Sequence, residues 1–215
     1  EDPEELFEEG AGAIGNATMN AQRTQSYEFG FNVQFSRHWA FSLMGWVKDM
    51  DQLTTSKTQR SGVYEYSVFD NGDFGSARGI DITLENRGLP INSLIQYTYS
   101  QAKSNSEYDW ASLGSQVMEA PAQEFLMPYD RTHDLTVTLY STLPFGVNIS
   151  LTGFFQSGQP YTPLIPRGSE GFMEDQRNKF TKRAPDYKQI NMSFSKYIKM
   201  KNLKMQFGLD VFNLL

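Results

Sequence analysis

Apolar and polar residues alternate along eight segments of this 215-residue chain. The clearest segment is 25–36, where every second residue is large and apolar: Tyr27, Phe29, Phe31, Val33 and Phe35. Successive side chains of a strand point to opposite faces, so each segment predicts a β-strand with one apolar and one polar face. The other seven segments are 39–48, 80–85, 95–100, 134–139, 147–152, 190–195 and 203–211.

The connections between these segments alternate between tight and long. Tight connections cover 36–38, 87–90, 144–146 and 199–202, whereas long connections cover 49–77, 103–131 and 157–186. Tight turns of this length join antiparallel strands in hairpins, and long loops are uncommon in compact soluble domains. The pattern predicts an all-β, antiparallel transmembrane β-barrel, with short periplasmic turns and long extracellular loops.

A soluble sandwich or a lipocalin-like barrel would also alternate, with its apolar face turned inward. Two features favour the membrane. Tyr27 and Tyr99 lie toward the long loops, whereas Phe35 and Trp39 lie toward the short turns, where aromatic girdles are expected. The predicted polar face also carries many hydrophilic side chains, which suit a wet interior: Glu28, Gln34, Lys48, Asp81, Glu85, Gln96, Gln156 and Gln206.

The net charge, the cysteine content and the hydropathy exclude several classes of partner and of membrane protein. The net charge is −6, which disfavours nucleic acid as a partner, and the absence of cysteine excludes disulfides and thiolate metal sites. No apolar run approaches the roughly 18 residues that a membrane-spanning helix requires. The mean hydropathy of −0.50 is compatible with a β-barrel, whose apolar residues are only every second one. Residues 1–6 show no feature of a signal peptide.

Several short motifs at the predicted strand boundaries resemble those of the C-terminal barrel of TonB-dependent outer-membrane receptors. Residues 15–30 resemble the family's GNPxLxPExSxSYExG sequence, although Ala17, Ala21 and Gln22 replace two prolines and a glutamate. Asp81 stands where the family usually has glutamate, and Asn191 stands where it usually has aspartate. The other segments that carry the resemblance are 69–73, 78–81, 129–133, 157–163, 183–196 and 210–214.

The resemblance implies a barrel of 22 strands around an N-terminal plug domain, of which this chain would supply about eight strands near the C-terminus. We expect 1–24 to be an extracellular loop segment and 25–215 to be barrel, with the plug and the final strand outside the chain. The implied function is energised uptake of a scarce nutrient such as a siderophore, cobalamin, an oligosaccharide or a peptide. Implied partners are outer-membrane lipid and lipopolysaccharide, the plug, the TonB energising complex through that plug, and the small nutrient.

Two alternative functions stay open: a passive porin-like channel, and a small outer-membrane barrel enzyme, since eight strands can close alone. An enzyme could use His133 with Asp134 and Asp130. Alternation, however, directs His133 to the apolar face with Leu135, away from Asp134, and no nucleophile motif accompanies it. His38 lies in a predicted short turn, exposed. We therefore expect no enzymatic activity, no catalytic residue, no cofactor and no metal site.

Acidic clusters raise the question of cation binding. The segment 70–73, Asp-Asn-Gly-Asp, offers oxygen ligands for calcium but lacks the spacing of an EF-hand, so a hairpin-like Asn-Gly turn is the preferred interpretation. A second cluster is most simply a solvated loop, although its carboxylates could bridge to lipopolysaccharide through divalent cations: Asp2, Glu4, Glu5, Glu8 and Glu9.

Residues that could contact a transported ligand or a plug fall in two groups. The first would line the lumen: Glu28, Asp81, Glu85, Gln96 and Gln156. The second lies in the long loops: Tyr108, Asp109, Trp110, Phe172 and Met173. Polar lumenal residues also solvate an interior, and loop aromatics also pack on other loops. The sequence therefore assigns no ligand-binding residue and does not identify the ligand.

Overall fold

One large antiparallel sheet forms most of the molecule. The computed structural model describes residues 9–10, 13–61, 64–88, 90–105, 124–166, 171–175, 178–201 and 203–215. Eight long strands follow one another in chain order across the sheet. They are β3 (Arg23–Gln34), β4 (Trp39–Ser61), β5 (Tyr64–Asn86), β6 (Asn92–Ser104), β8 (His133–Leu143), β9 (Val147–Gln156), β14 (Tyr187–Met200) and β15 (Leu203–Val211). All eight predicted strands are therefore confirmed.

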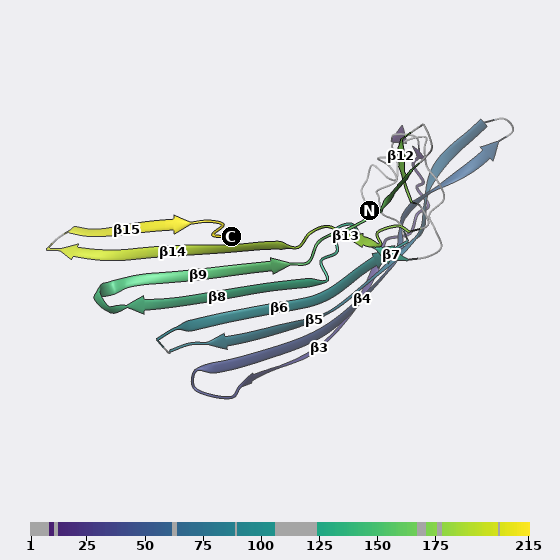
Figure 1. The fold of residues 1–215 in the computed structure, drawn as a ribbon. Coiled ribbons are helices and arrows are strands. Elements are labelled where there is room, and N and C mark those ends of the chain that lie inside the picture. Colours follow the sequence, from purple (N-terminus) through teal and green to yellow (C-terminus); the bar gives the residue numbers. More distant parts are fainter. Residues whose placement is uncertain are drawn as a thin grey trace.

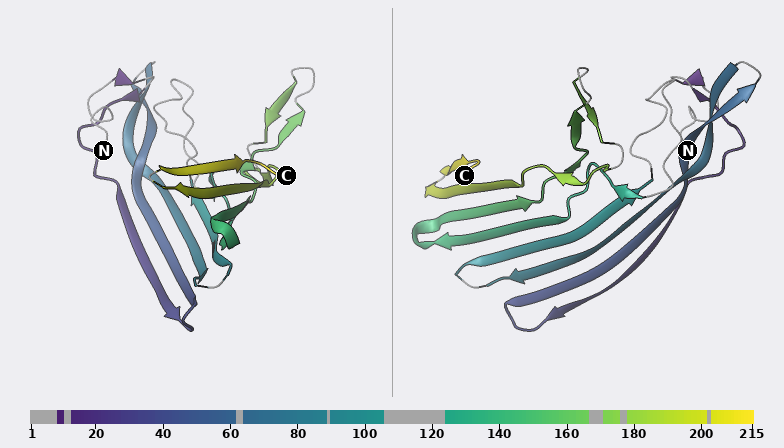
Figure 2. Two further views of the ribbon diagram at one scale, coloured as in Figure 1. Left: turned by 90° about the vertical axis from the view of Figure 1, so that its left-hand side faces the viewer. Right: turned by 45° about the vertical axis from the view of Figure 1, so that its right-hand side comes forward.

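The sheet is curved and open, and its two ends differ (Figures 1 and 2). Short turns join the strands at one end, whereas the other end carries longer excursions with small strands of their own. These are β1 (Glu9–Gly10), β2 (Ala13–Ile14), β7 (Phe125–Leu126), β10 (Pro160–Tyr161), β11 (Leu164–Pro166), β12 (Phe172–Glu174) and β13 (Lys182–Arg183). The asymmetry expected from the sequence is present, and the sheet is part of a barrel wall.

The strand register keeps the two faces continuous across the sheet. One row of directly opposed residues is apolar and runs over six strands: Phe31, Leu43, Ile82, Tyr97, Leu135 and Phe155. The adjacent row is largely polar: Asn32, Ser42, Thr83, Gln96, Thr136 and Phe154. Because side chains alternate along every strand, a register slip of one residue would mix the faces. We call them the apolar face and the polar face.

The apolar face is not packed into a core. Phe29 is 83% exposed, Leu209 60% and Phe31 47%. Among the described residues the buried hydrophobic side chains are only Phe69, Met127 and Phe180, far fewer than a soluble domain of this length needs. The soluble sandwich with an inward apolar face is thus not the fold. The helices of the described residues include none that is long and apolar enough to span a membrane.

The long connection predicted over 49–77 is wrong. Strands β4 and β5 run on through it as one extended hairpin, paired from Trp39–Asn86 out to Ser61–Tyr64, with a register irregularity between Met50 and Thr54. The extension is visible in Figure 1 beyond the ends of the other strands. The sequence of β4 is polar at every position from Thr54 to Ser61, so the alternation that marks a half-buried strand is absent from β4 there, while its backbone ladder with β5 still forms.

The other predicted long connections also contain regular structure. The segment 103–131 begins inside β6 and contains β7, and 157–186 contains the pairs β10–β13 and β11–β12. Residues 106–123 lie outside the described part of the chain. At the opposite end the tight connections are confirmed, and in one of them Phe145 and Gly146 adopt φ of 71° and 69° within the 3₁₀ turn Pro144–Gly146. Consecutive positive φ values suit the twist of a hairpin.

Candidate functional site

The polar face gathers the residues that the sequence assigns to a lumen. Register places Glu28 opposite Trp46, Asp81 opposite Thr98, and Asp134 opposite Gln156. Glu85 and Gln96 lie on the same face, since they are separated from Asp81 and Thr98 by even numbers of residues along their strands. The predicted lumenal set therefore shares one surface.

Trp46 is the residue of this surface that alternation explained least well. Its indole Nε1 donates to Asp81 Oδ2 at 3.0 Å, and Thr98 Oγ1 donates to Asp81 Oδ1 at 2.6 Å. The ring lies over Gly79: a Cβ there would come within 2.5 Å of the indole. Lys48 Nζ is 5.5 Å from the ring centroid, near enough for a cation–π contact. The indole thus donates a hydrogen bond to a carboxylate and packs over a glycine, on the largely polar face of the sheet.

His133 and Asp134 do not form a catalytic pair. The ring of His133 lies on the apolar face, with Nδ1 2.8 Å from the Tyr97 hydroxyl and its centroid 5.5 Å from that of Tyr99. Asp134 lies on the polar face, where Gln156 Nε2 donates to its Oδ2 at 2.7 Å. The sheet separates the two side chains, as alternation predicts, so no proton relay joins them.

Asp130 is the centre of a buried polar network at the long-loop end. The residue is 3% exposed. Its Oδ1 accepts from Ala102 N at 2.9 Å, and its Oδ2 accepts from Thr132 Oγ1 at 3.0 Å and from Arg183 Nη2 at 2.9 Å. Arg183 Nη1 also donates to Gly158 O at 2.9 Å. A buried carboxylate needs this kind of complete pairing, and here the pairing joins β6, the segment between β7 and β8, and the segment between β9 and β14.

We call this set of contacts around Asp130 and Arg183 the rim network, and close packing at Gly158 is part of it. Ser157 and His133 exchange hydrogen bonds, from His133 N to Ser157 Oγ at 3.0 Å and from Ser157 N to His133 O at 2.8 Å. A Cβ on Gly158 would lie 1.7 Å from Ala184 O. The three motifs at 129–133, 157–163 and 183–187 are separate in the sequence but contact one another in the rim network. Sequence reasoning quoted these motifs but missed their contact, because Asp130 and Arg183 are 53 residues apart.

The segment 70–73 is neither a hairpin turn nor a calcium loop. It lies within β5, paired with the bulged part of β4. Asn71 Nδ2 donates to Asn20 O at 2.9 Å and to Gln52 O at 2.8 Å, while its Oδ1 accepts from Asn20 N. Asp73, 3% exposed, accepts from Asn105 Nδ2 at 3.0 Å. The turn prediction was wrong because Asn-Gly also suits a bulged strand whose side chains tie down a crossing segment. No group of three or more potential metal ligands occurs among the described residues.

The remaining candidate residues are those of the N-terminal acidic cluster, the long loops and the short turn at His38. Asp2, Glu4, Glu5, Glu8, Tyr108, Asp109 and Trp110 fall outside the described residues, and the side chains of Glu9 and Met173 do too. Phe172 is 73% exposed in β12. His38 is exposed as predicted, and its Nδ1 lies 2.8 Å from Arg87 O, which joins two neighbouring short turns.

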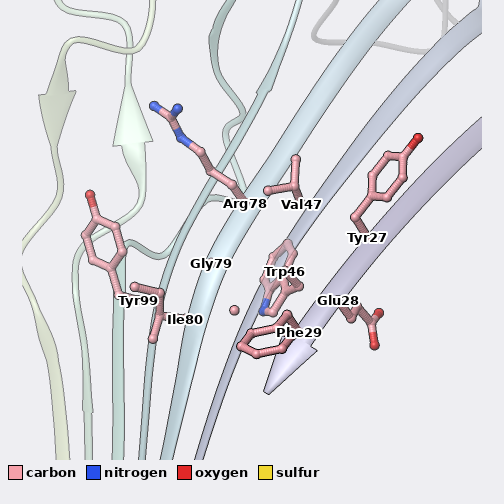
Figure 3. Close-up of a pocket in the computed structure, with 10 residues that line it drawn as sticks. Tyr27, Glu28, Phe29, Trp46, Val47, Arg78, Gly79, Ile80 and Tyr99 are labelled. Atoms are coloured by element: carbon pink, nitrogen blue, oxygen red, sulfur yellow. The ribbon is translucent and has the colours of Figure 1, made fainter. Parts of the chain in front are cut away.

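The apolar face contains a hollow of about 450 Å³ near Gly45. Phe29 and Ile80 flank it, and Tyr27, Val47 and Arg78 lie further toward the long-loop end (Figure 3). Tyr99 closes the side next to Ile80. The hollow is lined mainly by carbon, so it suits a hydrocarbon ligand or membrane lipid rather than a polar nutrient.

These features define an outer-membrane β-barrel protein: an antiparallel sheet with one exposed apolar face, one polar face, short turns and long loops. The family described as TonB dependent receptor-like, beta-barrel matches residues 2–214. The chain belongs to this family and to the bacterial outer membrane.

A solved structure agrees with this assignment. The outer membrane transporter YddB from Escherichia coli superposes with a TM-score of 0.70 at 8% identity, over 95% of this chain. At that identity the likeness concerns the fold. The chain spans 30% of the length of that transporter. No curated protein matches the chain by sequence.

Proposed function

We propose that this chain forms the C-terminal part of the barrel of a TonB-dependent transporter that imports a scarce nutrient in an energised manner. Residues 25–215 supply about eight of 22 strands, and 1–24 supply an extracellular loop segment. The pairing of β2 with β5 next to Ser67 and Val68, at the long-loop end, supports that division. Candidate nutrients are a siderophore, cobalamin, an oligosaccharide or a peptide.

The observation that carries this proposal is the continuous two-faced sheet within a family of receptor barrels. In the complete barrel the polar face would surround a plug domain, and the TonB complex would act on that plug. The acidic side chains of the polar face, Glu28, Asp81 and Asp134, would then face the plug or the passing nutrient. The rim network around Asp130 would hold the extracellular loops that receive the nutrient first.

Channel conductance distinguishes this function from a passive porin. The complete gene product is purified from outer membranes, inserted into planar bilayers and measured in KCl. A plugged transporter gives no steady conductance, whereas an open porin gives a lasting ohmic current. A steady current from the intact protein would contradict the proposal.

Growth of a deletion strain tests the import itself. The strain is grown with iron, cobalamin, an oligosaccharide or a peptide limiting in turn, beside a strain that lacks TonB. We expect a growth defect under one limitation, and the same defect without TonB. If the deletion strain showed the defect while the strain that lacks TonB grew normally, the function would be independent of TonB energy.

A further inference from the structure

The short-turn end of the wall carries an excess of positive charge. Its segments 35–40, 85–92, 143–148 and 196–205, which we call the periplasmic edge, contain six lysines and arginines and a single acidic residue, Glu85. The whole chain has 19 Lys and Arg against 25 Asp and Glu, so its acidic excess lies entirely in the other segments. The short-turn end of an outer-membrane barrel faces the periplasm. The six cations are Arg37, Arg87, Lys196, Lys199, Lys201 and Lys204.

Two of these cations line a polar hollow between neighbouring short turns. The hollow has a volume of about 200 Å³ and lies beside Arg37, His38 and Arg87. His38 Nδ1 lies 2.8 Å from Arg87 O, a contact that holds the two turns together. Arg87 pairs with Glu85, whereas Arg37 is exposed and forms no ion pair among the described residues. The hollow therefore offers an uncompensated guanidinium, whose planar donors match a carboxylate.

A second group of cations stands at the turn between β14 and β15. Register sets Lys199 directly opposite Lys204 on the polar face, and Lys201 lies in the turn itself with a φ of 45°. All three side chains are exposed, and none forms an ion pair with another described residue. Like charges directly opposite one another are destabilising. An anion bound between them would therefore stabilise this hairpin.

Both groups of cations are reached from the periplasm and not from the bilayer. Phe35 and Trp39 stack with ring centroids 6.4 Å apart, where the periplasmic aromatic girdle is expected. Arg37 lies in the turn beyond these two rings. Lys199 and Lys204 lie on the polar face, which is the face turned away from lipid. A partner of these cations is therefore a periplasmic anion and not a lipid headgroup.

One exposed aromatic ring lies between the two groups. The four short turns follow one another along the edge (Figure 1), and Phe145 occupies the third of them, between β8 and β9. Phe145 is 91% exposed and has a φ of 71°. A bulky residue with a positive φ is strained, and such strain concentrates at functional positions. The edge thus presents a line of cations interrupted by an aromatic ring.

We propose that the periplasmic edge binds peptidoglycan, the carboxylate-bearing glycan network beneath the outer membrane. Its stem peptides carry carboxylates that are complementary to the cations, and its sugar rings have apolar faces that can pack on Phe145. Neighbouring turns lie two strands apart, on the order of 10 Å, which suits a linear polymer with one anionic peptide on each disaccharide. A folded acidic protein would need a continuous interface of about 800 Å², whereas these contacts lie along a line. The inference depends on the sidedness of the barrel and not on which nutrient is transported.

Cosedimentation with purified peptidoglycan sacculi tests the proposal. The complete gene product in mild detergent is mixed with sacculi and centrifuged, and the bound fraction is measured over a range of protein concentrations. Each of two edge variants removes two cations. They are Arg37→Gln with Arg87→Gln, and Lys199→Gln with Lys201→Gln.

The matched control removes two exposed cations at the long-loop end: Arg23→Gln with Lys182→Gln. A further variant, Arg37→Lys with Arg87→Lys, retains the charge of the first edge group. Heat-modifiable gel migration verifies that every variant is folded. Sacculi whose carboxylates have been blocked by amidation are used in parallel.

We expect wild type and the long-loop control to bind sacculi alike. Each edge variant should bind about fivefold more weakly, which corresponds to about 1 kcal/mol for two exposed ion pairs. The two-lysine variant should bind more tightly than the corresponding glutamine variant, because it keeps the charge. Amidation of the sacculi should weaken the binding of wild type at least fivefold.

Failure of wild type to cosediment would overturn the proposal. So would equal binding by all the folded proteins, or an equal loss in the edge variants and in the long-loop control. Undiminished binding to amidated sacculi would show that carboxylates are not recognised. If the edge variants bound sacculi like wild type but bound phosphatidylglycerol vesicles more weakly, the edge would bind lipid headgroups instead.

Discussion

The membrane wall and the extracellular rim of this barrel are held together in different ways. In the wall the strands pair continuously, and the apolar face stays exposed, as with Phe29 and Leu209. At the rim, polar side chains are buried and bond to the backbone of other segments, as with Asp130 and Asn105. Every buried polar residue among those described, other than Asn86 and Ser93, lies toward the long-loop end.

The difference follows from what covers each region. Lipid covers the wall, so closed backbone pairing and an apolar face suffice. The rim projects beyond the lipid and carries chain segments that no extended ladder orders. Their backbone groups still need partners when buried, and side chains such as Asp130, Asn71 and Arg183 supply them.

The largest expected effect comes from placing a charge on the apolar face of the wall. Val137 lies in the middle of that face, opposite Ile95 and Gly153. Val137→Arg should reduce the free energy of unfolding by about 2–4 kcal/mol, because the guanidinium would face hydrocarbon. The neighbouring Thr136→Arg, on the polar face, should cost far less. Urea unfolding of the complete protein in phospholipid vesicles measures both, and equal losses would contradict the assignment of faces.

Glycine packing should matter at Gly158 in the rim and not at Gly153 in the wall. Gly158→Ala should cost about 3 kcal/mol, because its Cβ would overlap the backbone of Ala184. Gly153→Ala should leave stability nearly unchanged, since its Cβ meets open space. The two variants are compared by urea unfolding. If Gly158→Ala were as stable as Gly153→Ala, the close approach at the rim would be wrong.

Removing the cation of the rim network should loosen the loop segment it holds. Arg183→Gln leaves the buried Asp130 carboxylate without its charged partner, and we expect a local cost of about 2 kcal/mol. Hydrogen exchange of 157–163 should accelerate, while exchange in β5 stays as it was. The adjacent Lys182→Gln serves as the control because Lys182 is exposed. Unchanged protection in Arg183→Gln would show that the network does not hold the loop.

The smallest expected effect concerns the polar face of the wall. Trp46→Phe removes the donor to Asp81 and should cost about 1 kcal/mol in the free energy of unfolding. Combining it with Asp81→Asn should cost less than the sum of the two single changes, because both remove the same bond. Trp39→Phe, which retains an aromatic ring beside Phe35, is the comparison. Additive losses would argue against the Trp46–Asp81 contact.

The sequence predicted the wall more completely than the rim. Alternation located all eight long strands, but it ended β4 near Lys48, whereas the strand continues to Ser61. It also read Asn71 and Gly72 as a turn inside what is β5. Both errors occur where neither face contacts lipid, so that the two-residue period carries no signal.

For the candidate sites, too, the sequence predicted the arrangement within a wall strand but not the contacts at the rim. Alternation correctly separated His133 from Asp134, because facing is a local property of a strand. The network of Asp130, Arg183 and Gly158 could not be predicted, because its members are far apart in sequence and meet only through the arrangement of the loops. The hollow over Gly45 also depends on register, which sets Phe29 and Ile80 on either side of it.

The sequence by itself determined that this protein is a two-faced antiparallel sheet suited to a membrane, because the alternation of apolar and polar residues is a local property of each strand. Only the tertiary structure decided which residues of different strands stand opposite one another. It placed Trp46 against Asp81, joined Asp130 to Arg183 and opened a hollow beside Arg78. The physical reason is that pairing across strands depends on register and loop path, which the period of a single strand does not encode.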